Sequence, residues 1–520
     1  MNRFLKGAMI LTLAGIIVKC CGAIGKVLLA RILGGEGIGI YQMAYPVYQI
    51  VVGLATAGLP IAISIMIAEK LANQDMKGAK RVLHSSLVTL AALGVIFSGI
   101  LYLLSSYLIR WGIVVDERAY YALEALSPAI LVVTLLSCFR GYFQGFQNMM
   151  PTGVSQICEQ IIRIMAMVGL AIWLLPKGLG YGAAGATLAT FPAAFVGLCV
   201  LLVFYVRQGR LRRDLLAAQN TLIALEGYAS ILKRLFILAI PVSIANIMMP
   251  IVTGVDLLIV PHRLVESGYS ISQATASFGY LTGMATSLVN LPVILTTSLA
   301  ASLVPAVSEA FTMKDIQRIR NRTNTAMKIA NVITIPAFVG LCVLATPVSL
   351  LLYATPNAGA PIAVMSLSVF LLGIQQVTTG VLQGLGRTSI PMINLAIGLG
   401  IKIILNWYLT IIPSLGVNGA AWATNVDFGI AAILNVYFVY RYVGYTIRWG
   451  ELAKIAFSAL AMGGAVTVLF YFVVGTVGNT LATMVAIIGA VVIYVIALFV
   501  TRAMTKSDLQ AFPIIGKRFR

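Results

Sequence analysis

Long apolar stretches follow one another along almost the whole chain, and they constrain the fold more than any other feature. A window of about 20 residues, the length of a helix that crosses a bilayer, separates fourteen such spans. Their approximate limits are 8–30, 40–68, 83–109, 120–143, 152–175, 183–206, 235–260, 276–307, 326–352, 361–385, 388–412, 419–440, 453–475 and 481–502. Only 10% of the residues are charged, against roughly 25% in soluble domains. The sequence therefore predicts an all-α polytopic membrane protein with about fourteen transmembrane helices.

The distribution of lysine and arginine predicts how these helices are oriented. Of the 36 basic residues, 27 lie in the termini, in the loops after even-numbered spans or at the span ends beside them, five lie in the opposite loops, and four lie further inside spans. Because basic loops stay on the cytoplasmic side, we expect both termini in the cytoplasm of a bacterial cell (plasma) membrane protein. The net charge of +20 then follows mainly from topology, and we expect no nucleic-acid partner.

The two halves of the chain repeat each other. Arg163 matches Lys402 at an offset of 239 residues, and the run GAAGATLAT from Gly182 matches GVNGAAWAT from Gly416. The offset contains an even number of spans, so the repeat is parallel. We expect a six-helix lobe at 1–206, a basic cytoplasmic linker at 207–234, a second six-helix lobe at 235–442, and two extra helices with a basic tail at 443–520. The cleft between the two bundles is the expected substrate site, which is a transporter layout.

Basic residues inside the spans give this cleft its expected charge. Gly15, Lys19, Gly22 and Lys26 recur at helical spacing, so they share one face of the first helix. A lysine at mid-membrane is costly unless its face meets protein or water. Lys19, Lys26, Arg163 and Lys402, with Arg31 and Arg263 at the outer rim, are the substrate-binding candidates, and Arg163 and Lys402 are expected to face each other. The alternative for Lys26 is that it extends outward to the membrane surface.

Acidic residues within the spans are candidates as well. Glu159 precedes Arg163 by four residues and can pair with it on one helix, either as a structural ion pair or as a partner that releases Arg163 to an anionic substrate. Asp256 and Asp427, with Asn394, are candidates for coupling to a cation or proton. The two aspartates could equally neutralise the nearby lysines.

Motifs for enzymatic chemistry or cofactor binding are missing from the sequence. There is no Walker motif, no HExxH, no CxxC pair and no dinucleotide-binding glycine fingerprint. We therefore expect no cofactor and no metal site, and we do not expect an enzyme. The six cysteines all fall in apolar spans and are expected to be small core residues rather than disulfides or ligands. An anionic head group, especially a pyrophosphate, would suit the predicted cationic cavity.

Three segments resemble the stage V sporulation protein B family. They are FLKGAMILTLAGIIVKCCGAIGKVLLARILGGEGIGIYQMAYPVY, AGLPIAISIMIAEK and FRGYFQGFQNMMPTGVSQICEQIIRI. That family belongs to the polysaccharide-exporter branch of the multidrug/oligosaccharidyl-lipid/polysaccharide flippase superfamily and is related to lipid II flippases. The resemblance covers essentially the whole chain. It implies a two-lobed fold of fourteen helices that works by alternating access, and a role in sporulation or vegetative cell-wall synthesis.

The resemblance also implies a substrate and a binding helix. The substrate would be an undecaprenyl-pyrophosphate-linked sugar, and the expected one is the peptidoglycan precursor lipid II. Related flippases carry a basic residue in the first helix, a glycine three residues on and an arginine six residues on. Lys19 and Gly22 match the first two positions, but Gly25 stands at the third with Lys26 beside it. Arg31 matches the basic residue that closes that helix.

Four functional classes are weighed. The leading class is a flippase that moves a lipid-linked anionic oligosaccharide from the inner to the outer leaflet. Membrane lipids surround the protein, and a coupling ion or the membrane potential drives the transport. The second is an exporter of another lipid-linked polysaccharide unit. A cation-coupled multidrug antiporter is disfavoured by the resemblance, because some members of the drug-exporting branch use a carboxylate in the first helix for cation exchange and this first helix has no acid. A membrane glycosyltransferase is disfavoured because the predicted outer loops are short and hold only Glu36, Asp116, Glu117 and Glu266 as acids.

Overall fold

Helices form nearly all of the part of the chain that the structure describes. A computed structural model describes residues 3–56, 58–209, 214, 216 and 226–504, and these contain no β-strand. The first helices are α1 (Arg3–Thr56), α2 (Leu59–Ala72), α3 (Met76–Arg110), α4 (Ala119–Gly145), α5 (Met150–Leu174), η1 (Leu175–Lys177), α6 (Leu179–Leu188), α7 (Thr190–Arg207), α9 (Tyr228–Glu266) and α10 (Ile271–Phe278). The π-helix η2 (Gly279–Ala285) precedes α11 (Thr286–Thr312), α12 (Ile316–Val343), α13 (Ala345–Tyr353), α14 (Gly359–Gly384), α15 (Ser389–Leu409), α16 (Val417–Val443) and α17 (Trp449–Val500).

The chain divides into two compact units. Unit 1 comprises Met1–Val265 and Tyr269–Gly279, and unit 2 comprises Glu266–Gly268 and Tyr280–Arg520. Helix α9, which begins inside the predicted linker, therefore belongs almost entirely to unit 1. Much of that linker and the basic tail beyond 504 lie outside the described residues. The lobe limits expected from the internal repeat stay a prediction.

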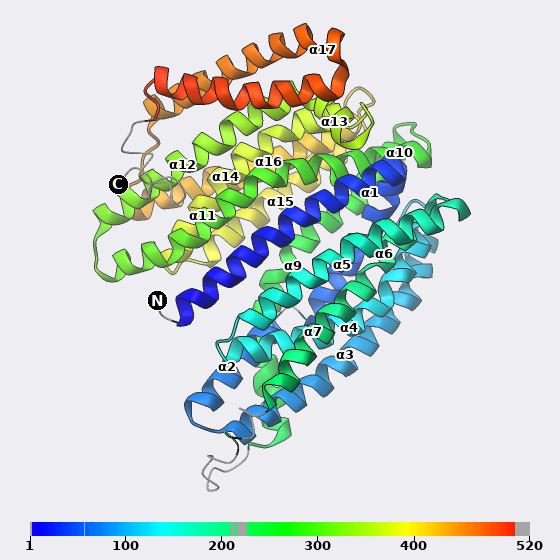
Figure 1. The fold of residues 1–520 in the computed structure, drawn as a ribbon, viewed down its shortest axis with the longest axis vertical. Helices are drawn as coiled ribbons and strands as arrows, with labels where there is room; N and C mark the ends of the chain where they lie inside the picture. The colour runs from blue at the N-terminus through cyan, green and yellow to red at the C-terminus, as the bar shows by residue number, and fades with distance from the viewer. Residues whose placement is uncertain (1–2, 57, 210–213, 215, 217–225, 505–520) are drawn as a thin grey trace. The chain divides into compact units, whose positions relative to one another are not determined.

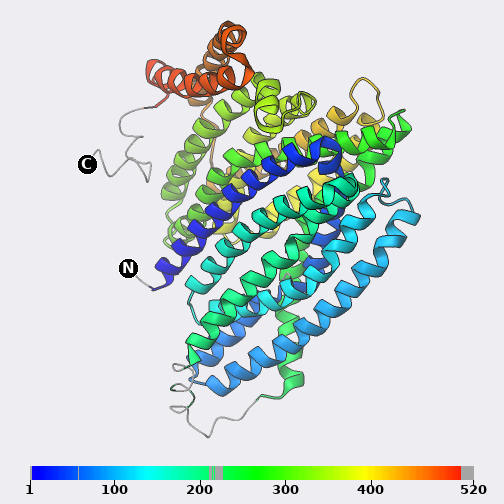
Figure 2. The ribbon, with the colours of Figure 1, turned by 45° about the vertical axis from the view of Figure 1, so that its right-hand side comes forward.

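Two very long helices each contain a sharp break at a glycine. Gly34 in α1 and Gly478 in α17 have positive φ angles of 67° and 74°, a backbone region in which glycine carries no steric penalty. Each break separates two of the predicted spans, and Figures 1 and 2 both show the two arms of α17 folded back against each other. In the described part of the chain, eleven helical segments are long and apolar enough to cross a membrane. An all-α polytopic membrane protein is confirmed, whereas the count of fourteen and the cytoplasmic termini stay predictions.

The same local geometry recurs at repeat-related positions in the two units. Asp75 accepts a hydrogen bond from the Gly78 backbone N–H at 2.7 Å and caps α3, and Asp315 accepts one from the Arg318 N–H at 2.8 Å and caps α12. Gln74 and Lys314, the residues before them, have positive φ angles of 55° and 56°. A carboxylate at a helix N-terminus satisfies a backbone donor that would otherwise lack a partner.

Close helix crossings recur as well. A Cβ on Gly145 in α4 would lie 2.8 Å from Ile67 Cβ in α2, and one on Gly384 in α14 would lie 2.7 Å from Val307 Cβ in α11. Small residues at such crossings let two helix backbones approach closely, as is common in membrane bundles. The second and eighth predicted spans behave differently at their prolines: the second breaks before Pro60, while α11 continues through Pro305.

Large apolar side chains cover much of the surface of these helices. Phe472 is 84% exposed, Tyr471 72%, and Val206 73%. A soluble protein rarely exposes such continuous apolar surface, but a helix in lipid turns its apolar residues outward and its polar residues toward other helices. The polar side chains inside each unit are therefore the informative ones.

Candidate binding site

Two arginines hold one glutamate inside unit 1. Arg140 Nη2 on α4 donates to Glu159 Oε2 on α5 at 2.7 Å, and Arg163 donates to Glu159 Oε1. Helix α7 closes the cluster at Gly197, where a Cβ would lie 3.5 Å from Glu159 Oε2. The three charged side chains are 13–22% exposed. The predicted Glu159–Arg163 pair is present, and the second arginine leaves the cluster with a net positive charge.

Tyrosines on the second half of α1 approach this cluster. The rings of Tyr41 and Tyr45 stack with centroids 5.5 Å apart, and those of Tyr45 and Tyr48 lie 5.9 Å apart. All three are close enough to Arg163 to interact with it electrostatically. Phenol groups offer hydrogen bonds together with apolar surface, so the surroundings of Arg163 suit a ligand that is anionic and carries a sugar or a hydrocarbon.

Helix α1 packs against α5 through the glycines that lie between its lysines and next to Lys26. A Cβ on Gly22 would lie 3.4 Å from Gln160 Nε2, and one on Gly25 would lie 2.9 Å from Ile164 Cγ1. Lys19 is exposed and Lys26 is half-buried on the same helix. The glycines thus bring α1 against the helix that carries Glu159 and Arg163. Both lysines belong to unit 1, together with that cluster.

A second ion cluster lies where the loops predicted to be external meet in unit 1. Arg118 Nη2 contacts Glu36 Oε1 at 2.6 Å and Asp116 Oδ2 at 2.7 Å, while Thr275 Oγ1 donates to Asp116 Oδ2 at 2.8 Å. Burial raises the pKa of the Asp116 carboxyl, but the hydrogen bonds from Arg118 and Thr275 outweigh it, so the pKa stays below its ordinary value. These carboxylates are engaged in an ion network, which does not favour a catalytic role for them.

The remaining candidates of unit 1 lie on α1 and α9. Arg31 is exposed on α1, three residues before the break at Gly34. Arg263 is half-buried near the end of α9, and Asp256 is buried on the same helix, two turns earlier. Their predicted roles in substrate binding and ion coupling stay predictions.

Unit 2 holds Lys402, Asp427 and Asn394, and all three are buried. Lys402 and Asn394 lie on α15, and Asp427 lies on α16. Helices α15 and α16 pack closely along their length. Arg163 and Lys402 belong to different units, so their predicted apposition stays a prediction; within unit 2, Lys402 is only 2% exposed.

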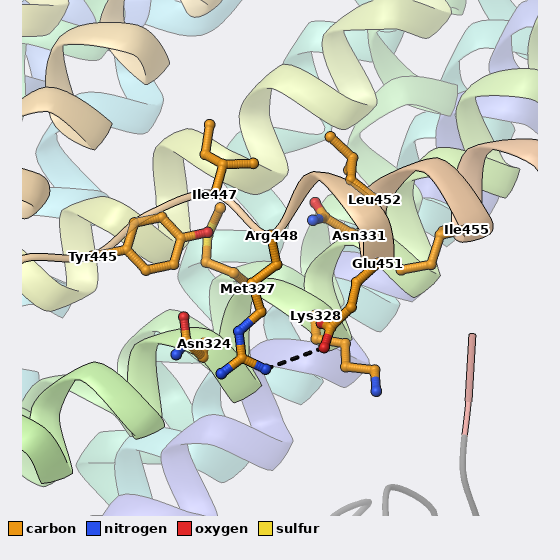
Figure 3. A pocket seen from close by; sticks show the side chains of 10 residues that line it. All are labelled: Asn324, Met327, Lys328, Asn331, Tyr445, Ile447, Arg448, Glu451, Leu452 and Ile455. Atoms are coloured by element: carbon orange, nitrogen blue, oxygen red, sulfur yellow. Dashed lines mark hydrogen bonds and ion pairs between the residues drawn. The ribbon is translucent and has the colours of Figure 1, made fainter. Parts of the chain in front are cut away.

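A small pocket in unit 2 is a poor substrate site. It lies between α12 and the start of α17, and Figure 3 shows Arg448 paired with Glu451 at its mouth, 3.1 Å apart, with Lys328 and Asn331 beside them. Its cavity volume is ≈ 20 Å³, which has room for little more than one water molecule. A sugar-bearing pyrophosphate does not fit there.

Cysteines and metal-type clusters give no further site. All six cysteines are free, and only Cys138 is fully buried, so the expectation of core residues is wrong for the exposed Cys20 and Cys342. Among the described residues, no group of three or more His, Cys, Asp or Glu side chains is arranged to hold a metal ion.

Comparison with known proteins gives consistent matches over the whole chain. Residues 4–311 match the family described as "Polysaccharide biosynthesis protein", and residues 241–408 match the family MatE. The chain is 30% identical to stage V sporulation protein B of Bacillus subtilis (strain 168), over 99% of each protein. It is 28% identical to lipid II flippase MurJ of the same organism, over 94% of this chain and 93% of that protein.

Solved structures share the fold. Lipid II flippase MurJ in an inward closed conformation gives a TM-score of 0.70 at 18% identity, covering 95% of this chain and 99% of that one. An inward-facing multidrug resistance MATE family transporter of the MOP superfamily gives 0.66 at 18% identity, covering 82% and 94%. The identity to stage V sporulation protein B over the whole chain confirms the resemblance expected from the three sequence segments.

Proposed function

We propose that this chain flips lipid II from the inner to the outer leaflet. The premise is that the chain belongs to the polysaccharide biosynthesis protein family, in the branch that includes stage V sporulation protein B. The chain is a multi-pass membrane protein whose relatives are flippases and transporters rather than enzymes. A relative named lipid II flippase that aligns over 94% of this chain supports that cargo.

The observation that carries the proposal is the positive charge inside unit 1. Arg140 and Arg163 share the single carboxylate of Glu159, and Lys19 and Lys26 lie on the helix packed against α5. Cations in lipid are retained where they bind a ligand or a partner. A pyrophosphate presents several anionic oxygens, which guanidinium groups can bind in pairs and ammonium groups can bind as point charges.

The individual residues take graded roles in this proposal. Lys19 is exposed and makes the first contact with the head group, while Lys26 and Arg163 bind it more deeply. Glu159 holds Arg163 in place until the anion competes for it. Arg31 and Arg263 attract the anion near the end of the path. The polyprenyl tail stays in lipid, against the exposed apolar faces of the helices.

Another lipid-linked glycan is the second candidate cargo. The family description "Polysaccharide biosynthesis protein" supports it, because the cationic cluster would bind any pyrophosphate-linked sugar. A cation-coupled multidrug antiporter has support from the MatE match at 241–408. The excess of cations in unit 1 favours an anionic cargo over the cationic drugs that such an antiporter would carry.

A leaflet-accessibility assay in proteoliposomes tests the proposal. Fluorescent lipid II and a fluorescent phospholipid are compared for the wild type, Lys19→Ala and the exposed control Lys454→Ala, with and without an ion gradient. We expect selective movement of lipid II that Lys19→Ala abolishes and Lys454→Ala preserves. Equal movement of both lipids would contradict a specific site. If another undecaprenyl-pyrophosphate-linked glycan moves and lipid II does not, that glycan replaces lipid II as the proposed cargo.

A further inference from the structure

Helix α15 carries a buried polar stripe. Every fourth residue along it is polar or small and faces into unit 2: Asn394, Gly398, Lys402, Asn406 and Thr410. The opposite faces expose large apolar residues, such as Ile404 at 57% and Tyr408 at 65%. The helix is thus apolar toward lipid and polar toward protein, and its polar stripe lies in the seam with α16.

Asp427 of α16 lies in this seam against Gly398. A Cβ on Gly398 would collide with Asp427 Oδ1 and lie 2.7 Å from the Asp427 carbonyl oxygen. Lys402 follows Gly398 by one helical turn, and helical side chains lean toward the N-terminus. The Lys402 side chain therefore leans toward the turn that the carboxylate touches.

Both charges are removed from water. Asp427 is 0% exposed and Lys402 2%. Among the described residues of unit 2, Asp427 is the one acid inside a transmembrane span, since the other acids lie at or just beyond helix ends: Glu266, Glu309, Asp315 and Glu451. An isolated carboxylate in such a place is costly, so its charge must be balanced within the seam.

The neighbouring amides are committed to protein partners. Asn394 Nδ2 donates to Asn435 Oδ1 at 2.8 Å, and Asn435 Nδ2 donates to Thr379 Oγ1 at 3.1 Å. Asn425 Nδ2 donates to the Val364 carbonyl at 2.8 Å, and Asn425 Oδ1 accepts from the Ser368 hydroxyl. Carboxylate and amide oxygens in one apolar seam are ligands that a hard cation prefers. In this seam a cationic side chain is already present.

We infer that the Lys402 ammonium is the resident counter-ion of Asp427. The ammonium is tethered to α15 and takes the position that a free monovalent cation would otherwise occupy. The seam of the wild-type protein therefore needs no inorganic cation. Removing the ammonium while keeping Asp427 creates a cation site. This inference concerns unit 2 alone and does not rest on the cargo proposed above.

Thermal unfolding of the purified full chain, followed by tryptophan fluorescence, tests the inference. Choline chloride is replaced stepwise by LiCl, NaCl or KCl at constant ionic strength. We expect no saturable shift in the wild type. Lys402→Met, which keeps the length and apolar stem of the side chain, should unfold roughly 5–10 °C lower in choline. One of the small cations should restore this loss saturably.

Matched variants separate charge balance from packing. The double variant Lys402→Met/Asp427→Asn should regain most of the lost stability and should not respond to cations, and Lys454→Met, at an exposed position on α17, should behave as the wild type. If Lys402→Met alone does not fold, recovery of folding in the double variant supports the inference. Failure of the double variant, while Asp427→Asn folds, overturns it.

Two other results would overturn the inference. The first is a saturable sodium or potassium shift in the wild type that Asp427→Asn abolishes, because a free cation would then occupy the seam beside Lys402. The second is a Lys402→Met protein as stable as the wild type in choline and unresponsive to cations. Neither result depends on which lipid is transported.

Discussion

Arg140 Nη2 on α4 donates a 2.7 Å hydrogen bond to Glu159 Oε2 on α5. Through this bond the carboxylate predicted to pair with Arg163 alone is shared between two guanidinium groups. The shared Glu159 carboxylate therefore links α4 to α5 through Arg140, and it links two turns of α5 through Arg163. This sharing makes Glu159 a positioning group for Arg163. The cluster of two arginines and one glutamate keeps a net positive charge.

Removing Arg140 should weaken both stability and transport. Arg140→Met leaves Glu159 with Arg163 as its partner, so we expect a loss of about 1–3 kcal/mol in unfolding free energy rather than the larger cost of a fully unpaired buried charge. We also expect slower flipping, because a tighter Glu159–Arg163 pair competes with the substrate anion. Thermal unfolding and the proteoliposome assay measure the two effects. Arg110→Met, at the exposed end of α3, is the control, and equal behaviour of the two variants would contradict the shared pair.

Lys19 should tolerate a change of cation better than its loss. Lys19→Ala removes the positive charge and should abolish flipping, whereas Lys19→Arg keeps the charge in a different geometry and should retain part of the activity. Both proteins should unfold near the wild-type temperature, because Lys19 is exposed. Initial flipping rates at matched protein density provide the measurement. Wild-type rates for a well-folded Lys19→Ala protein would remove Lys19 from the binding site.

Local spacing predicted part of the site, and contacts between distant segments supplied the rest. The Glu159–Arg163 pair follows from an i, i+4 spacing and is present. Arg140 lies three residues before the end of its predicted span, so the sequence groups it with the cytoplasmic basic residues. Only the packing of α4 on α5 brings Arg140 to Glu159. The tyrosines near Arg163 come from α1, more than 100 residues away.

The burial of Lys402 could have been predicted from the sequence alone. Its repeat relationship with Arg163 suggested an exposed position on a cleft, yet polar or small residues recur every four positions from Asn394 to Thr410. That period indicates one continuous polar face, and a continuous polar face on a lipid-exposed helix must be covered by another helix. The structure shows α16 covering it.

The Asp116 network should make stability depend on acid pH. The pKa of Asp116 is lowered on folding, so its contribution is fully present above the unfolded pKa of about 3.9 and is lost as the pH falls through the lower folded value. Asp116→Asn should therefore unfold below the wild type at pH 7, with a difference that shrinks below about pH 4. Glu117→Gln, its exposed neighbour, should show no such difference. A gap between Asp116→Asn and wild type that stays constant across this range would exclude the carboxylate's charge as the cause.

A pair of glycines on α15 tests how closely α16 approaches it. A Cβ on Gly398 would collide with Asp427, whereas one on Gly400 would meet no atom within 4 Å. Gly398→Ala should lower the unfolding free energy by about 1–3 kcal/mol, because the contacts include the Asp427 backbone oxygen, which cannot swing aside. Gly400→Ala should be neutral or stabilising by up to about 1 kcal/mol, because alanine loses less conformational entropy in a helix than glycine. Thermal unfolding of the two proteins in the same detergent measures the contrast. Equal midpoints would mean that the seam holding Lys402 and Asp427 is looser than these contacts require, and would weaken the case for a tethered counter-ion there.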